Sequence, residues 1–112
     1  MKKTEKTATI KFKVNLDINN VPEDITWEAT DSQKKQNKAK AVMISVWDGV
    51  EQTSLKIDLW TKEMMTEEMR FFIFQIIDSL SETYKKSIGD EKIANEIKDF
   101  AKRIGKMSNV LK

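Results

Sequence analysis

Apolar and polar residues alternate along the first half of the chain, a pattern typical of strands that bury one face. Four segments follow this pattern: residues 8–18, 25–29, 38–48 and 55–59. The third segment has apolar side chains on both faces, which favours a central strand or one whose outer face is covered by a helix or a partner chain. Turn residues separate the segments. We therefore predict a four-stranded antiparallel meander.

After Trp60 the spacing of apolar residues lengthens to three and four, which is typical of helices. The pattern predicts a first helix with Thr66 as its N-cap and Gly89 as its stop. A second helix is expected from Asp90, with Gly105 marking the place where it ends or bends. Its apolar residues form an a/d seam: Ile93, Ile97, Phe100, Ile104, Met107 and Leu111. The predicted fold class is α+β, a four-stranded antiparallel sheet followed by two C-terminal α-helices.

The length of 112 residues suits one domain, which can bury about 65% of its unfolded surface. Charged residues make up 34% and hydrophobic residues 39% of the chain, a balance typical of folded proteins. We expect a single domain over 1–112, with a strand half over about 7–61 and a helical half over about 64–108.

The chain has no cysteine and no histidine. Thiolate nucleophiles, the Ser/His/Asp triad and nearly every zinc arrangement are thereby excluded. Acidic residues are numerous, yet they show no EF-hand or comparable ligand spacing, and helix caps or solvated strand edges explain them better. The most prominent are Asp48, Asp58, Glu63, Glu67 and Glu68. We expect a protein that is not an enzyme and that uses no cofactor and no metal.

The longest apolar stretch, residues 71–77, is interrupted by Gln75 and is far shorter than the roughly 20 residues that span a bilayer. The basic N-terminus is not followed by the apolar run of a signal peptide. The net charge of +2 is too small to indicate nucleic-acid binding. A cytoplasmic protein with no membrane span and no nucleic-acid partner is expected.

The segment FFIFQII is the sharpest feature of the sequence. If the sheet covers only one side of this helix, then some of its apolar side chains remain for another chain: Phe71, Phe72, Phe74 and Ile77. The alternative is complete burial inside the domain. Trp60, which falls on the same side of its strand as two charged residues, is the best tryptophan candidate for an interface. The predicted interface residues are thus Trp60, Phe71, Phe72 and Phe74.

Two further groups of residues have competing interpretations. Trp27 and Trp47 can belong to an exposed aromatic platform with Trp60, but their apolar neighbours favour partly buried packing. The lysines of the polar segment 31–38 can bind phosphate or acidic partners, but the segment has no interleaved aromatic residues that would read a base, and an exposed, solvated loop is the favoured interpretation. The lysines in and next to this loop are Lys34, Lys35, Lys38 and Lys40.

Nearly the whole chain resembles the gliding motility protein GldC family of the Bacteroidetes. The stretches that carry the likeness are VPEDITWEATDS, VWDGVEQTSLKIDLWTKEMMTEEMRFF and IKDFAKRIG, and ITWEA and KIDLWTKEM are the most diagnostic. The resemblance implies a small cytoplasmic accessory protein linked to surface gliding and its associated secretion machinery. It assigns no catalytic residue.

Two hypotheses follow for function. In the first, the chain is an accessory or assembly protein of the gliding machinery that acts by protein–protein interaction, as a homodimer or a larger homo-oligomer. In the second, it is a chaperone that binds unfolded or secreted clients, because the order of strands followed by helices is also that of the SecB family. An enzyme working with carboxylates and lysines alone is the least favoured class.

Overall fold

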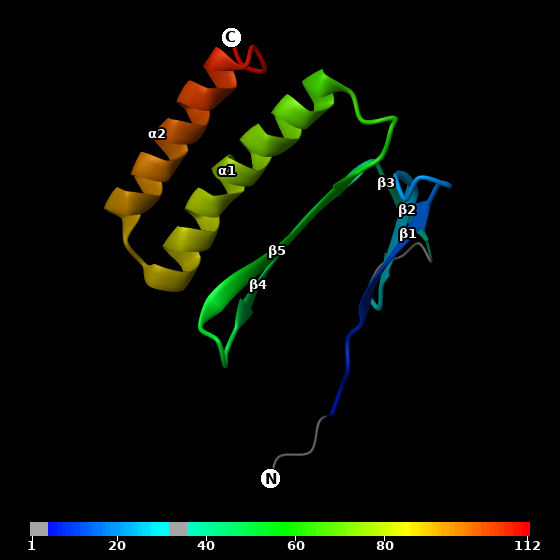
Figure 1. Cartoon of the computed structure of the whole chain (residues 1–112). Coiled ribbons are helices and arrows are strands. Elements are labelled where there is room, and N and C mark those ends of the chain that lie inside the picture. The colour runs from blue at the N-terminus through cyan, green and yellow to red at the C-terminus, as the bar shows by residue number, and fades with distance from the viewer. Residues whose placement is uncertain (1–4, 32–35) are drawn as a thin grey trace. The chain divides into compact units, whose positions relative to one another are not determined.

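The computed structural model of the chain describes residues 5–31 and 36–112, and it contains five strands and two helices over those ranges. The elements are β1 (Ile10–Leu16), β2 (Pro22–Ala29), β3 (Asn37–Ala39), β4 (Ala41–Asp48), β5 (Thr53–Trp60), α1 (Thr66–Ile88) and α2 (Glu91–Met107) (Figure 1). They form two compact units, Met1–Met64 with the strands and Met65–Lys112 with the helices. The α+β class and the two C-terminal helices are confirmed.

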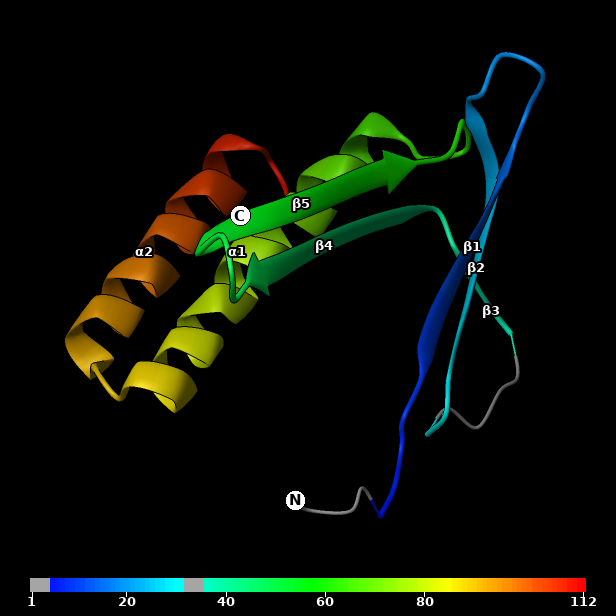
Figure 2. The ribbon, with the colours of Figure 1, turned by 60° about the horizontal axis from the view of Figure 1, so that its bottom comes forward.

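Strands β1, β2 and β3 form an antiparallel sheet in that order, with β2 in the middle. Figure 2 shows β1 and β2 side by side. Opposite residues of antiparallel strands share a face, so the pairs Phe12–Trp27 and Val14–Ile25 lie together on the apolar side. Ile25 is fully buried and is the centre of this face.

Strands β4 and β5 form a two-stranded antiparallel hairpin in a regular register from Ala41–Trp60 to Asp48–Thr53. The side chain of Asp48 organises its turn, since Oδ1 accepts hydrogen bonds from the backbone N–H of Val50 at 2.9 Å and of Glu51 at 3.2 Å. Aspartate is favoured at such positions because its short carboxylate reaches the backbone two residues on.

The predicted single four-stranded sheet is wrong. The predicted strand 38–48 bends at Lys40, so its first residues pair with β2 while the rest pairs with β5. The bend is fixed by Thr61, which is buried and donates to the Lys40 carbonyl from its backbone N–H at 2.8 Å and its hydroxyl at 3.2 Å. Within the described residues β4 has only β5 as a strand neighbour, so of the two alternatives for this segment the central strand is wrong.

The boundaries of α1 follow local capping chemistry. The helix begins at Thr66, and Met65 rather than Thr66 is the N-cap, which corrects the prediction. The Glu68 carboxylate accepts a hydrogen bond from the Met65 backbone N–H at 3.0 Å, as in a capping box. Gly89 ends the helix with φ +84°, a left-handed conformation that glycine adopts without strain, as predicted.

Helix α2 begins after Asp90, whose Oδ1 accepts a hydrogen bond from the Ile93 backbone N–H at 3.2 Å. The helix continues through Gly105 to Met107, so the predicted helix end at Gly105 is wrong. The chain then turns back, and the N–H groups of Val110 and Leu111 both donate to the Gly105 carbonyl. A Cβ added at Gly105 would lie 2.6 Å from Leu111 Cδ1 and 3.0 Å from Phe74 Cδ1, so glycine there permits close packing.

Candidate functional site

The β4–β5 hairpin has one face on which three successive cross-strand pairs are aliphatic. This hairpin face consists of the opposite pairs Val42–Leu59, Ile44–Ile57 and Val46–Leu55. Val42 is buried, but Val46, Leu55 and Ile57 at the turn end are each more than half exposed. Because a two-stranded hairpin is only marginally stable by itself in water, an exposed aliphatic face of this kind favours a covering surface.

The two helices meet along a narrow side of small residues. Lys98 Nζ lies 3.3 Å from Asp78 Oδ1, and Lys85 Nζ lies 3.4 Å from Glu91 Oε1. The later residue of α1, Lys85, pairs with the earlier residue of α2, Glu91, so α1 and α2 are antiparallel, as Figure 1 shows. The buried residues of α2 lie on the same side as Lys98: Ala94, Ala101 and Gly105.

A second side of the helix pair is apolar. At about 100° per residue, the apolar stripe of each helix lies more than a quarter turn from the side that meets the other helix. In both helices, the rotation about the helix axis from the contact side to the apolar stripe has the same direction when each helix is viewed from its N-terminus. Because the helices are antiparallel, this rotation brings the two apolar stripes to the same side of the helix pair. We call this side the helix-pair face, and its exposed members are Ile73, Leu80, Ile93 and Phe100, at 40–51%.

The residues predicted at an interface occupy different environments. Trp60 is 55% exposed at the end of β5, and Phe71 is 44% exposed on α1. Phe72 and Phe74 are partly buried, and Phe71 and Phe74 make an edge-to-face contact with ring centroids 6.0 Å apart. Trp60 and the three phenylalanines belong to different units, and their assignment to an interface stays a prediction.

The tryptophans do not form one platform. Trp27 is partly buried on the apolar side of its sheet, as predicted, whereas Trp47 is 65% exposed, so the packing predicted for it is wrong. Trp47 and Trp60 share a face of the hairpin but lie at its opposite ends, about 20 Å apart at the usual rise per residue. The alternation of side chains along residues 41–48 does not predict the exposure of Trp47, because it does not tell whether another element covers the face that carries this residue.

A hollow of about 260 Å³ lies beside Trp60, between the β1–β2 turn and the end of β5. We call it the Trp60 hollow. Its lining residues are Asn20, Val21, Pro22, Asp58, Leu59 and Trp60. Aliphatic, proline and indole surfaces form its walls, and Asp58 contributes a carboxylate that lies 3.5 Å from the ammonium of Lys56. It therefore combines an apolar interior with an exposed acidic group.

Asp17 organises the turn on one side of the Trp60 hollow. Its Oδ1 accepts hydrogen bonds from the backbone N–H groups of Asn19 at 2.8 Å and Val21 at 2.9 Å. Its Oδ2 lies 2.5 Å from the ammonium of Lys62, two residues after Trp60 in the chain. This ion pair connects the β1–β2 turn to the residues that follow β5 and fixes both sides of the hollow.

The same pair shifts both ionisation equilibria. The hydrogen bond from Lys62 and those from backbone N–H groups hold the pKa of Asp17 below its ordinary value of 3.8, and the Asp17 carboxylate raises the pKa of Lys62 above 10.5. The Asp17 contribution to stability is thus present above about pH 3.8 and is lost as the pH falls through the lowered pKa. The Lys62 contribution is present below about pH 10.5 and is lost as the pH rises through the raised pKa.

Replacing Lys62 by methionine is expected to flatten the dependence of stability on pH below about 3.8, because Asp17 then keeps a more ordinary pKa. Urea unfolding midpoints measured over a pH series give this dependence directly. Lys56→Met is the control, since it removes an exposed ammonium 3.5 Å from Asp58 and leaves Asp17 untouched. An unchanged acid slope in Lys62→Met would contradict the coupling.

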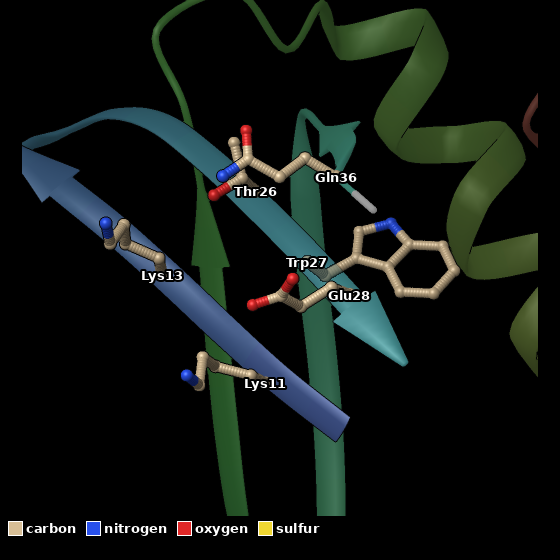
Figure 3. A pocket seen from close by; sticks show the side chains of 6 residues that line it. All are labelled: Lys11, Lys13, Thr26, Trp27, Glu28 and Gln36. Carbon is tan, nitrogen blue, oxygen red and sulfur yellow. The ribbon is translucent and has the colours of Figure 1, made fainter. Parts of the chain in front are cut away.

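A second, polar hollow of about 100 Å³ lies on the three-stranded sheet. In Figure 3, Lys11 and Lys13 extend from β1 and Glu28 from β2, while the indole of Trp27 points away from these lysines. The Glu28 carboxylate offsets one of the two ammonium charges, so the hollow has no strong preference for an anion. Of the lysines near the predicted loop, Lys38 and Lys40 are exposed, and Lys34 and Lys35 lie outside the described residues.

The acidic residues do not assemble into a metal site anywhere in 5–31 or 36–112, where no group of three His, Cys, Asp or Glu side chains could hold an ion. Neither helix of the structure is long and apolar enough to cross a bilayer. The residues that the sequence interpretation missed are those of the β1–β2 turn in the Trp60 hollow. Their only signal is an aspartate followed by two asparagines, which predicts a turn but not its position beside β5.

The comparisons with known proteins give one match. A family model described as gliding motility-associated protein GldC-like matches residues 22–110. That range extends over parts of both units, without β1, and includes most of the Trp60 hollow, the hairpin face and the helix-pair face. No curated protein and no solved structure matches the chain.

Proposed function

Because the chain belongs to the GldC-like family of gliding motility-associated proteins, we propose that it is a non-enzymatic, cytoplasmic accessory protein of the gliding machinery and its associated secretion system. It acts by protein–protein interaction and assembles into a homodimer or a larger homo-oligomer. The family supports the link to gliding, and the exposed apolar faces support the mode of action.

One observation carries the proposal of interaction. Seven of the large aliphatic and aromatic side chains that remain 40% or more exposed lie together on two continuous faces. Three belong to the hairpin face and four to the helix-pair face. Contiguous exposed apolar patches on a folded chain mark surfaces that other proteins cover, because their hydration is unfavourable. We assign self-association to the helix-pair face, since two helices provide a broad platform for the same face of a second copy.

The double variant Leu80→Ser/Phe100→Ser is expected to lower the self-association constant about tenfold to a hundredfold, the range typical when interface anchors are truncated. Light scattering over a concentration series measures it. The matched control is Ile18→Ser/Val50→Ser, in which the residues are 96% and 89% exposed and lie outside both faces. If the wild-type chain stays monomeric at every concentration, the proposed self-association is contradicted. A partner protein of the gliding machinery is then the proposed occupant of these faces.

The link to gliding has its own test. Deleting the gene in the host bacterium is expected to slow surface spreading, and the wild-type chain or the Ile18→Ser/Val50→Ser chain restores it. The Leu80→Ser/Phe100→Ser chain is expected to fail while reaching the same cellular level. Normal spreading after deletion contradicts a role in gliding.

The chaperone hypothesis keeps support from one feature, the hairpin face with three aliphatic residues more than half exposed. Its topological motivation is weaker, because the strands form a three-stranded and a two-stranded sheet. A chaperone of this kind suppresses aggregation of thermally unfolded citrate synthase at stoichiometric amounts, and Val46→Ser/Leu55→Ser reduces that protection. Absence of protection by the wild-type chain eliminates this candidate.

A further inference from the structure

The Trp60 hollow is acidic although the chain as a whole is basic. The two segments around it, residues 17–24 and 56–63, carry five carboxylates and two lysines, whereas the full chain has a net charge of +2. Both lysines already have carboxylate partners: Lys62 is paired with Asp17 and is also attracted by Glu23, and Lys56 lies beside Asp58. The electrostatic potential around the hollow therefore favours a cation.

The walls of the hollow suit one kind of cation. An indole that is 55% exposed attracts a cation over its face, and a guanidinium also stacks on aromatic rings because it is planar and weakly hydrated. Asp58 lies two residues before Trp60 on the same side of β5, so its carboxylate is available beside the ring. Its present partner, Lys56, is more than half exposed, and exposed ion pairs of this kind exchange readily.

The remaining walls suit apolar neighbours of that cation. Val21, Pro22 and Leu59 supply aliphatic surface inside a volume of about 260 Å³, which is larger than one guanidinium needs. The turn that carries Val21 and Pro22 is held by the Asp17 hydrogen bonds and by the Asp17–Lys62 pair, so the hollow is formed before any partner arrives. Preorganisation of this kind lowers the entropic cost of binding.

We propose that the Trp60 hollow binds a basic segment of a partner protein, with an arginine guanidinium stacked on the Trp60 indole and paired with Asp58. An apolar side chain next to that arginine packs against Pro22 and Leu59. Asp17 and Lys62 are positioning residues, which hold the turn and do not touch the partner. The inference rests on the proposed function, protein–protein interaction, and specifies the chemistry of one partner.

Nuclear magnetic resonance tests the inference directly, because the chain has three tryptophans and therefore three indole N–H signals. The ¹⁵N-labelled chain is titrated with N-acetyl-Leu-Arg-Leu-amide and with the matched Leu-Gln-Leu and Leu-Glu-Leu peptides, and Trp60→Phe assigns the Trp60 signal. We expect only the Trp60 signal to shift to saturation, with an arginine-peptide Kd at least about tenfold below that of the glutamine peptide. Raising the salt concentration weakens this binding.

Asp58→Asn is expected to weaken arginine-peptide binding about fivefold or more, while Glu51→Gln, at the distant hairpin turn, leaves it unchanged. Equal binding of the arginine and glutamine peptides, equal shifts of the Trp47 signal, or no shift of Trp60 overturns the proposal. A Trp60→Ala variant that loses self-association in light scattering also overturns it, because the hollow then holds a second copy. Failure of the peptide titration leaves the gliding and self-association tests unaffected, so the two proposals fail separately.

Discussion

Replacing Ile25 by alanine lowers the free energy of unfolding of this chain by about 2–5 kcal/mol, the usual cost of truncating a buried isoleucine. Ile25 is fully buried and is the largest side chain in that state among the described residues. It lies in the middle of β2, opposite Val14 of β1 and Ala39 of β3. Its truncation leaves a cavity where the three strands of the sheet converge.

Urea unfolding followed by circular dichroism measures this effect, and Ile18→Ala is the matched control. Ile18 is 96% exposed in the β1–β2 turn, so its truncation is expected to change stability by no more than about 0.5 kcal/mol. A loss below about 1 kcal/mol in Ile25→Ala would show that the sheet contributes little to the stability of the chain.

Replacing Gly105 by valine is expected to destabilise the chain by about 1–3 kcal/mol, as overpacking of a closely packed site does. The new side chain begins 2.6 Å from Leu111 Cδ1 and 3.0 Å from Phe74 Cδ1, so it pushes on the folded-back C-terminal residues and on α1 at once. Thermal unfolding followed by the helical circular dichroism signal measures the loss. Gly49→Val is the control, because nothing lies within 4 Å of the position of a Cβ at Gly49.

A second substitution separates the two contacts at Gly105. Truncating Leu111 to alanine removes the nearer contact, so the double variant Gly105→Val/Leu111→Ala is expected to be more stable than the sum of the two single effects. Strict additivity would show that Leu111 does not press on residue 105, and that the close approach of Phe74 alone limits the site.

Two apolar surfaces of this chain are available for protein–protein contacts. The helix-pair face and the hairpin face belong to different units, and each has three or four large apolar side chains that are 40% or more exposed. The Trp60 hollow is chemically distinct from both, since it joins an indole and a carboxylate. In the proposed assembly, the helix-pair face would bind a second copy and the hollow would stay open for a basic partner, so oligomerisation and recognition would use separate surfaces.

The predicted interface residues show how far the spacing of apolar residues can predict a binding surface. Phe71 and Trp60 were singled out as surplus apolar side chains, and both are partly exposed in the structure. Phe74 belongs to the same apolar segment as Phe71 but lies beside Gly105, one of the small buried residues of α2. Spacing along one helix cannot reveal which of its sides a second helix will meet, because that choice depends on Ala94, Ala101 and Gly105 of the partner helix.

The sequence by itself determined the α+β class, the two C-terminal helices and the family, because periodicity, capping residues and turn residues are local properties of the chain. It also located the helix stop at Gly89 and the hairpin turn after Asp48. Only the tertiary structure decided that the strand 38–48 bends at Lys40 into two sheets and that the β1–β2 turn meets the end of β5. Both outcomes depend on long-range bonds, from Thr61 to Lys40 and from Lys62 to Asp17, between residues that no local pattern connects.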